Sequence, residues 1–454
     1  MPGGRDGRPV FFARNFYLSP VRPQPKELFA PAKEMLILGV RKELMIMAQQ
    51  EITEADLRAR VRKLLEEAHP DKVDQFTFRG KQYDHGLAWV HFPEGYGGLG
   101  ISPGMQVFVA DELAKHAKTH YDDMMINAIG IGMGAPTVLT HGTDWMRDNL
   151  LRRIFTGEDI WCQLFSEPSA GSDVAGLATR AVREGDDWVI NGQKVWTSLA
   201  HLSNWAMLLA RTDPDKPKHS GMSYFLLDMH SPGVEVRPLH QITGEAEFNE
   251  VFFTDVKIPA DRIMGKVGDG WKVALTTLMN ERTAIGGAPT RPGGGAIGVL
   301  MELWKSRDTK HFTSDAEIVM RDRITKLYIE AELLRITVQR GKAARKAGNP
   351  GPEGSVAKLA QAELNKRIWE CAMDVIGGDS LVYEAGYQRR RPTSRTREGR
   401  FAMAKYQFLR ARANSIEGGT SEVMRNILGE RVLGLPGEPR SDKDIPWKNI
   451  PRSA

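Results

Sequence analysis

The feature that most constrains the fold is a change of pattern in the middle of the chain. Between about residues 159 and 259, short runs rich in β-branched and aromatic residues are separated by Asn-Gly, Asp-Pro and Ser-Pro-Gly turns. These runs are 188–190, 205–210, 223–227, 234–236 and 250–253. Short strands with turns at such intervals predict an antiparallel barrel or sandwich.

On both sides of this segment the apolar residues have helical spacing. The segments with this spacing are 54–65, 111–125 and 143–154 before it, and 271–282, 316–345, 356–376, 401–414 and 421–433 after it. The pattern predicts an α+β protein whose domains follow in the order α, β, α. The expected parts are an extension at 1–32, an N-terminal helical domain at 33–158, a middle β domain at 159–266, a C-terminal helical domain at 267–436 and a tail at 437–454.

Composition excludes several classes of protein. The 454-residue chain has a net charge of +5, but its acids and bases are interspersed, which argues against a nucleic-acid surface. Its two cysteines, Cys162 and Cys371, lie in apolar runs without metal-ligand spacing, so we expect buried thiols rather than a disulfide framework or a metal site.

The pattern of hydrophobicity bears on location. No run reaches the roughly 18 apolar residues that a membrane-spanning helix needs. We expect a soluble, cytoplasmic protein. The mitochondrial matrix is the alternative, because residues 1–32 are rich in Arg and poor in acids, although their prolines weaken any amphipathic helix there.

Two short segments carry candidate chemistry. Phe165–Asp173 reads as a strand end followed by a turn of small residues, whose free amides and hydroxyls suit an anionic or aromatic ligand. Taken alone, an ordinary tight turn is the better explanation of this segment. Lys194–Ser198 ends another strand with an indole beside two hydroxyls, which can stack on a planar ring and bond its heteroatoms.

With three further motifs in the same order, the sequence resembles the acyl-CoA dehydrogenase family from about Glu54 to Pro436. The motifs are Ser-Glu-Pro-x-Ala-Gly-Ser-Asp, Trp-Thr-Ser, Phe-Asn-Glu-Val-Phe-Phe, Asn-Glu-Arg and Ile-Glu-Gly-Gly-Thr-Ser-Glu. The resemblance implies a C-terminal four-helix bundle, an FAD cofactor held between the β domain and the C-terminal helices, and an oligomer that shares the FAD site.

The resemblance also assigns residues to the cofactor. The isoalloxazine is expected near Phe165, Ser166, Trp196 and Ser198, and Thr420 and Glu422 match positions that touch the flavin. Ser172 is expected near the cofactor phosphate or the pantetheine arm of the substrate. Gly377 and Gly378 either contact FAD across a subunit interface or form a helix C-cap.

One family motif is missing. Many members carry Arg-x-x-Phe-Gly, whereas this chain reads Val-Met-Arg-Asp-Arg at 319–323, where Arg321 or Arg323 is a candidate substitute. The segment Arg389–Arg400 either binds the CoA phosphates or is a solvated loop. Gly293–Gly295 lacks the ending of a nucleotide P-loop and reads as a plain loop.

Oxidation of a thioester needs a base, a polarised carbonyl and a hydride acceptor. In one branch of the family the base is a glutamate before Gly-Thr near the C-terminus, but here that position is Gly418, and Glu417 lies one residue early. In another branch it precedes an arginine on the first helix of the C-terminal domain, as Glu281 precedes Arg282. We expect Glu281 as the base with Glu417 as the alternative, the amide of Gly418 as a donor to the thioester oxygen, and Arg282 as a substrate contact.

The resemblance implies an α,β-dehydrogenation of an acyl-CoA, as in fatty acid β-oxidation, with electrons passing to an electron-transfer flavoprotein. A related flavin oxidase or monooxygenase is an alternative, as is a noncatalytic subunit of a heteromeric acyl-CoA dehydrogenase. The expected assembly is a homodimer or homotetramer. The acyl group is not specified by the sequence.

Overall fold

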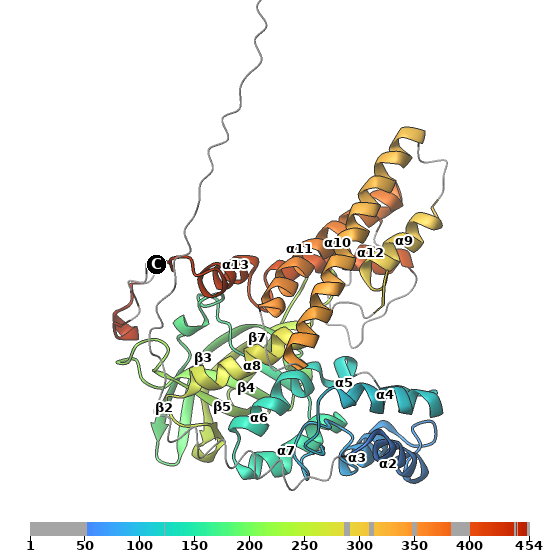
Figure 1. The fold of residues 1–454 in the computed structure, drawn as a ribbon. Coiled ribbons are helices and arrows are strands. Elements are labelled where there is room, and N and C mark those ends of the chain that lie inside the picture. Colours follow the sequence, from blue (N-terminus) through green and yellow to red (C-terminus); the bar gives the residue numbers. More distant parts are fainter. Residues whose placement is uncertain are drawn as a thin grey trace, which may run out of the picture. The chain divides into compact units, whose positions relative to one another are not determined.

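The computed structural model describes residues 52–121, 123–285, 291–307, 313–346, 352–382, 400–439, 442 and 444–451 (Figure 1). The expected extension at 1–32 and the segment Arg389–Arg400, apart from the backbone of residue 400, lie outside the described residues.

The N-terminal part of the described chain is helical, as predicted. Its helices are α2 (Glu54–Glu67), α3 (Gln75–Asp84), α4 (Met105–His116), α5 (Asp123–Ile129), α6 (Ala135–His141) and α7 (Asp144–Thr156). Leu57, Val61 and Leu64 recur every three or four residues along α2, so one face of the helix is buried. Helix α7 begins at the side-chain cap of Thr143 and ends at Gly157, whose φ of 85° suits glycine.

The helix predicted at 111–125 is wrong in its continuity. Helix α4 ends at His116, because Ala117 is extended, and α5 begins only at Asp123. The carboxylate of Asp71 accepts the amides of Lys118 and Thr119 at 3.1 and 2.7 Å. The backbone bonds with a distant loop, which helical periodicity does not reveal.

The middle of the chain forms one eight-stranded sheet. Its strands are β1 (Trp161–Leu164), β2 (Arg180–Glu184), β3 (Asp187–Ser198), β4 (Trp205–Arg211), β5 (Met222–Asp228), β6 (Val234–Leu239), β7 (Phe248–Pro259) and β8 (Ile263–Met264). The order is β6-β7-β3-β2-β4-β5-β8, with β1 beside β4. Among the described strands, the parallel pairings are those of β4 with β1 and with β2. The antiparallel character expected for the β domain is confirmed.

Strand β5 is buried on both of its faces. Tyr224 and Leu226 belong to the core shared with the N-terminal helices, whereas Phe225 and Leu227 belong to the core on the other side. Because successive side chains of a strand point to opposite faces, both faces of this strand are covered.

The C-terminal part is again helical, which confirms the fold class. Its helices are α8 (Gly270–Ile285), α9 (Ala296–Lys305), α10 (Ser314–Lys346), α11 (Glu353–Ile376), α12 (Arg400–Arg410) and α13 (Ser421–Ile427). Helices α9 to α12 share one apolar core, in which α10 and α11 lie side by side (Figure 1). Helix α8 instead packs on strands β4 and β5 (Figure 1).

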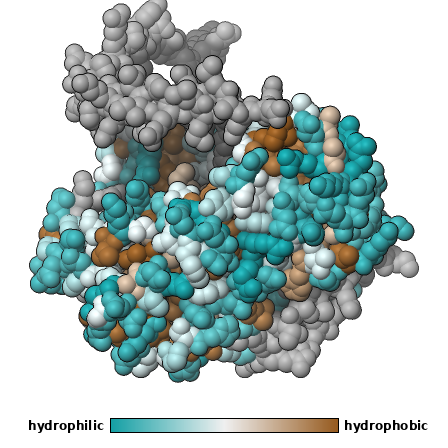
Figure 2. Space-filling model, turned by 90° about the horizontal axis from the view of Figure 1, so that it is seen from below, coloured by the Kyte–Doolittle hydropathy of each residue, from teal (hydrophilic) through white to brown (hydrophobic). Residues whose placement is uncertain are grey.

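The described surface is mainly hydrophilic on the face shown in Figure 2, with scattered apolar residues. Both cysteines are buried and free, as predicted. Among the described helices, none combines the length and the apolar character that crossing a bilayer requires.

Candidate active site

The two candidate segments of the β domain lie against each other. The amide of Val195 donates to the carbonyl of Ser166 at 2.9 Å. Ser166 follows strand β1, whereas Val195 precedes Trp196 in β3, so a single hydrogen bond joins the two motifs. The hydroxyls of Ser166 and Ser198 make no hydrogen bond with any other residue that the structure describes, and both residues are half-buried.

A buried ion pair also joins these two segments. The ammonium of Lys194, which is fully buried, lies 2.8 Å from the Glu167 carboxylate and donates to the Phe165 carbonyl at 2.9 Å. Glu167 also accepts the amides of Ala178 and Thr179 at 2.6 and 2.9 Å. Burial raises the pKa of Glu167, but Lys194 and these bonds outweigh it and hold the pKa below its usual value.

Sequence reasoning missed this ion pair. The available signal was a lysine inside an apolar strand and a glutamate inside a turn of small residues, 27 positions apart. A buried charge needs a partner, so each residue points to the existence of the other.

Trp196 has a strained backbone and an exposed ring. Its φ is 61°, a region that bulky residues rarely adopt, and the β3–β7 register shifts between Lys194 and Thr197. The side chain amide of Asn249 donates to the Thr197 carbonyl at 3.0 Å, which supports the bulge from β7. Trp196 is 62 % exposed, and its ring lies edge-on to that of Phe248, at 6.2 Å between ring centroids.

Helix α8 is anchored to the same part of the sheet. Phe165 contacts Tyr224 edge-on at 5.7 Å, and the Tyr224 hydroxyl lies 2.8 Å from that of Thr277 on α8. Thr277 also lies 3.0 Å from the hydroxyl of Thr137. Glu281 follows four residues after Thr277, on the same face of the helix and one turn farther along.

Lys358 on α11 connects Glu281 with the last family motif. Its buried ammonium donates to the carbonyl of Asn414 at 3.1 Å and to that of Gly419. Burial lowers the pKa of Lys358, and the charges of Glu417 and Glu281 oppose this shift. The two candidate carboxylates therefore lie within electrostatic reach of one buried cation.

Glu417 is held by the last residue of helix α12 and by a residue of its own loop. Its carboxylate accepts two bonds from Arg410, at 3.1 and 2.8 Å, and a third from Asn414 at 2.9 Å. Arg410 in turn lies 5.6 Å from the ring of Phe248. Because Phe248 also contacts Trp196, this series of contacts brings the loop at 411–420 to the indole.

Gly418 has a φ of 64°, which favours glycine over any residue with a side chain. Among the described residues, none accepts a hydrogen bond from its amide. The amide is therefore available as a donor.

The remaining expected residues have varied surroundings. Ser172 is exposed on its turn. Thr420 caps helix α13 by accepting the amide of Val423 at 3.1 Å, and the exposed Glu422 pairs with Arg425 at 3.2 Å. The side chain of Arg282 lies outside the described residues.

Gly377 and Gly378 follow helix α11. Gly377 has a φ of 68° at the helix end, which accounts for a glycine there. An added Cβ would meet no atom within 4 Å at either position, so no close approach within the described chain requires them. Of the two candidate arginines in the missing motif, Arg323 forms an ion pair with Asp374, whereas Arg321 is exposed.

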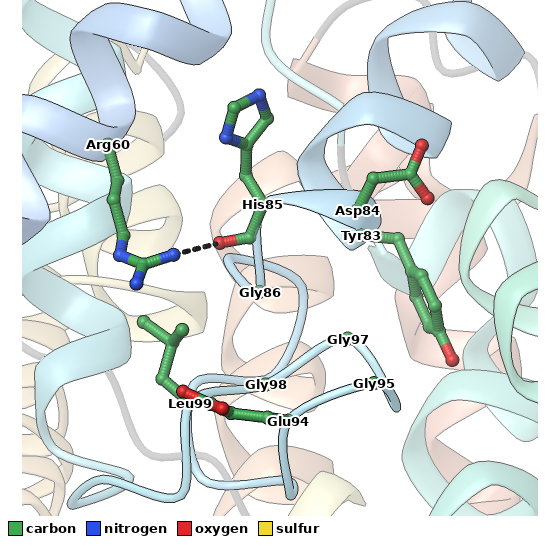
Figure 3. A pocket seen from close by; sticks show the side chains of 10 residues that line it. All are labelled: Arg60, Tyr83, Asp84, His85, Gly86, Glu94, Gly95, Gly97, Gly98 and Leu99. Atoms are coloured by element: carbon green, nitrogen blue, oxygen red, sulfur yellow. Dashed lines mark hydrogen bonds between the residues drawn. The ribbon is translucent and has the colours of Figure 1, made fainter.

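A cavity of about 480 Å³ lies elsewhere, among the N-terminal helices (Figure 3). It is lined by Arg60, Tyr83, Asp84, His85, Gly86, Glu94, Gly95, Gly97, Gly98 and Leu99. None of the expected site residues is among them. Gly98 has a packing reason, because an added Cβ would lie 2.1 Å from the Phe92 carbonyl.

Three family models match consecutive parts of the chain. They are the acyl-CoA dehydrogenase N-terminal domain at residues 43–158, the middle domain at 162–256 and the C-terminal domain at 268–433. Together they cover both halves of the candidate site.

Individual relatives agree with the models. The chain is 39% identical over 357 residues to the acyl-CoA dehydrogenase IpdE1 of Mycobacterium tuberculosis, covering 78% of this chain and 86% of that protein. It is 40% identical over 356 residues to the acyl-CoA dehydrogenase FadE34 of the same organism, but spans only 45% of that protein, again with 78% of this chain.

Solved structures have the same fold. An acyl-CoA dehydrogenase from Geobacillus kaustophilus matches with a TM-score of 0.63 at 26% identity, covering 85% of this chain and 99% of that one. The ChsE4–ChsE5 complex from Mycobacterium tuberculosis matches with a TM-score of 0.62 at 25% identity, covering 91% of this chain and 100% of that one.

Proposed function

Because the chain belongs to the acyl-CoA dehydrogenase family of oxidoreductases, we propose that it oxidises an acyl-CoA thioester between its α and β carbons. In this proposal Glu281 removes the α proton. FAD, when bound, supplies the acceptor for the β hydride. The remaining steps are carried out by residues of this chain, which orient the two ligands and exclude water.

The observation that carries the FAD proposal is the exposed, strained indole of Trp196 beside two uncommitted hydroxyls. A residue in a sparsely populated backbone region costs about 1–3 kcal/mol, and such strain concentrates at ligand sites. The ring offers a flat apolar surface, and Ser166 and Ser198 offer donors and acceptors for a heteroaromatic edge. These residues fit an isoalloxazine.

The position of Glu281 on helix α8 favours it as the base over Glu417. The Glu417 carboxylate accepts three hydrogen bonds from Arg410 and Asn414, so its oxygens are turned toward residues of the chain. Glu281 lies one turn beyond Thr277, whose hydroxyl contacts that of Tyr224, the residue that packs on Phe165. This position suits proton removal from a ligand that lies against the flavin.

The amide of Gly418 is the proposed donor to the thioester oxygen. It is free among the described residues, and Lys358 fixes the backbone at the next residue, Gly419. A donor aimed where negative charge develops stabilises the enolate-like state that proton removal creates.

A further surface supports self-association. Helix α10 exposes Ile318, Ile329, Leu333 and Ile336. Their spacing of 11, 4 and 3 residues puts them on one helix face, where a second copy of the chain would bury them. We propose a homo-oligomer with a shared FAD site, and electron-transfer flavoprotein as the electron acceptor.

A heteromeric assembly is the second candidate for the quaternary state. The solved ChsE4–ChsE5 structure is a complex of two differently named chains, and it matches 91% of this chain. Measuring the mass of the purified protein and its flavin content distinguishes the two. A homo-oligomer that retains yellow cofactor supports the proposal, whereas a chain that retains it only together with a second type of subunit indicates a heteromer.

The reaction is tested by anaerobic bleaching of the purified flavoprotein with a panel of CoA thioesters carrying straight, branched or ring-containing acyl groups. The proposal predicts loss of flavin absorbance with at least one member. No bleaching by any thioester contradicts it. Fast oxygen consumption during turnover would instead identify an oxidase.

A further inference from the structure

The chain returns to the β domain near its C-terminal end. The amide of Trp447 donates to the carbonyl of Lys216 at 2.9 Å, and that of Lys448 to the carbonyl of Pro214 at 3.1 Å. These contacts dock residues 442–451, of which all but 443 are described, on the loop between β4 and β5. We call residues 442–451 the C-terminal strap. It lies beyond residue 433, where the match to the family models ends.

The strap contacts the turn that follows the first motif. The indole N–H of Trp447 donates to the carbonyl of Gly176 at 3.2 Å, and the ring centroid lies 4.8 Å from the guanidinium carbon of Arg211. Arg211 is buried and donates to the carbonyls of Ala175 and Leu177 at 2.6 and 3.3 Å. Trp447 and Arg211 therefore hold the same three-residue stretch.

Lys218 makes a second connection. Its ammonium lies 2.8 Å from the Asp173 carboxylate and 2.5 Å from the Asp442 carboxylate of the strap. Burial lowers the pKa of Lys218, but the bonds to both carboxylates outweigh it and the net shift is upward. The cation thus stays charged and bridges the strap to the residue that directly follows Ser172.

The turn itself has little internal support. Gly171, Ser172 and Asp173 are exposed, and none of their amides donates a hydrogen bond to another described residue. Its own backbone bonds run only from Gly176 to Asp173 and from Leu177 to Val174, at 2.9 and 3.2 Å. Consecutive free amides in a turn form an anion-binding surface when their conformation is held.

We propose that the C-terminal strap is a positioning element for the pyrophosphate of a ligand bound at Ser172. It holds residues 171–177 in the conformation in which the Ser172 hydroxyl and the neighbouring amides donate hydrogen bonds to phosphate oxygens. Because the turn is already ordered before the ligand binds, binding does not have to offset the free energy of ordering it. The strap therefore raises affinity. The inference rests on the proposed function, whose two ligands, FAD and the CoA thioester, both carry a pyrophosphate.

Two full-length variants test the strap. Trp447→Ala removes the indole contacts with Gly176 and Arg211. Asp442→Asn removes the carboxylate charge that pairs with Lys218, while keeping the side-chain size. Lys448→Ala is the matched control, because its ammonium pairs with Asp215 and not with the turn. Hydrogen exchange of 171–177, the Kd for FAD, and KM and kcat for the thioester are measured for each, with thermal unfolding to verify the fold.

We expect faster hydrogen exchange at 171–177 in Trp447→Ala. The Kd for FAD or the KM for the thioester should rise about tenfold with little change in kcat, as loss of uniform binding predicts. Asp442→Asn shows the same change at smaller size. If the pyrophosphate is that of FAD, flavin is lost and added FAD restores it. If it is that of CoA, flavin stays bound, while KM and the Kd for CoA itself rise together.

Unchanged or tighter binding of both ligands in Trp447→Ala overturns the strap proposal, as does an equal effect of Lys448→Ala. If the parent protein binds flavin and is bleached by a thioester while the variants match it, the strap proposal alone fails. A parent protein that binds neither ligand contradicts the proposed function and the strap proposal with it.

Discussion

The two sides of the candidate site are stabilised differently. On the β-domain side, the fully buried Lys194 and its partner Glu167 fix the backbone under the exposed Trp196. On the helical side, Lys358 and Arg410 face two carboxylates, Glu281 and Glu417. The difference teaches that the proposed surface for the flavin ring is supported by a buried ion pair, whereas the proposed proton transfer depends on how a few charged side chains are paired.

Breaking the buried pair gives the largest expected effect on stability. Lys194→Met leaves Glu167 buried without its cation, which costs about 3–5 kcal/mol of unfolding free energy. Denaturant unfolding measures the loss. The control is Lys326→Met, which breaks an exposed pair with Asp322 and costs less than about 1 kcal/mol. Equal losses in the two variants would contradict the role of the buried pair.

The same variant has a predictable pH dependence. In the parent protein Glu167 has a lowered pKa, so its contribution to stability is present above the ordinary carboxyl pKa and is lost as pH falls. Without Lys194, burial is opposed only by the hydrogen bonds from residues 178 and 179, so the pKa of Glu167 rises and the protonated form is tolerated better. The deficit of Lys194→Met should therefore be smaller at pH 5 than at pH 8.

Lys358 probes the helical side. Lys358→Met removes charged hydrogen bonds to the carbonyls of Asn414 and Gly419, for a loss of about 1.5–3 kcal/mol. A carboxylate that loses a nearby cation holds its proton to higher pH, so the acid limb of the flavin-reduction profile should move to higher pH. Lys358→Arg keeps the charge and should restore the profile. If the acid limb of Lys358→Met did not move, the Lys358 charge would have no influence on the base.

Gly418 has a smaller effect. With a φ of 64°, Gly418→Ala should cost about 1–2 kcal/mol, because an L side chain strains this backbone conformation. Gly378→Ala is the control, since its φ is not positive and an added Cβ would meet no atom within 4 Å. Thermal unfolding compares the two variants, and an equal change in both would argue against a conformational need for glycine at 418.

Trp196 has the smallest expected energy. Trp196→Ala should weaken FAD by about three- to tenfold, because ring contacts contribute about 0.5–1.5 kcal/mol. Trp145→Ala, which removes another partly exposed indole on α7, should change the Kd for FAD by no more than about twofold. Fluorescence titration of the apoprotein with FAD measures both. Equal effects would mean that the flavin does not lie on Trp196.

Much of the fold followed from the sequence because periodicity is a local signal. The α, β, α order was predicted from the spacing of apolar residues, and the collinear motifs predicted the family. The helix break at Ala117 was not predicted, because it depends on Asp71, more than forty residues away. The positive φ of Trp196 was equally hidden, since the register shift involves a partner strand.

The candidate site was predictable in its residue types but not in their pairing. The motifs named Ser166 and Trp196, and the structure brings their segments together through Val195. The motifs did not reveal that Arg410 forms an ion pair with Glu417, or that Lys194 forms one with Glu167, because both pairs depend on how the chain folds. Charges in a sequence show which groups need partners, and the fold decides which partners they have.

The most direct test compares Glu281→Gln with Glu417→Gln, both carrying flavin, in anaerobic stopped-flow reduction by a thioester that bleaches the parent protein. A positioned general base contributes about 10²–10⁴-fold. We expect the rate of flavin reduction to fall by that factor in Glu281→Gln and by less than about tenfold in Glu417→Gln, whose carboxylate already accepts hydrogen bonds from Arg410. Flavin reduction at the parental rate in Glu281→Gln, or the larger loss in Glu417→Gln, would contradict this expectation.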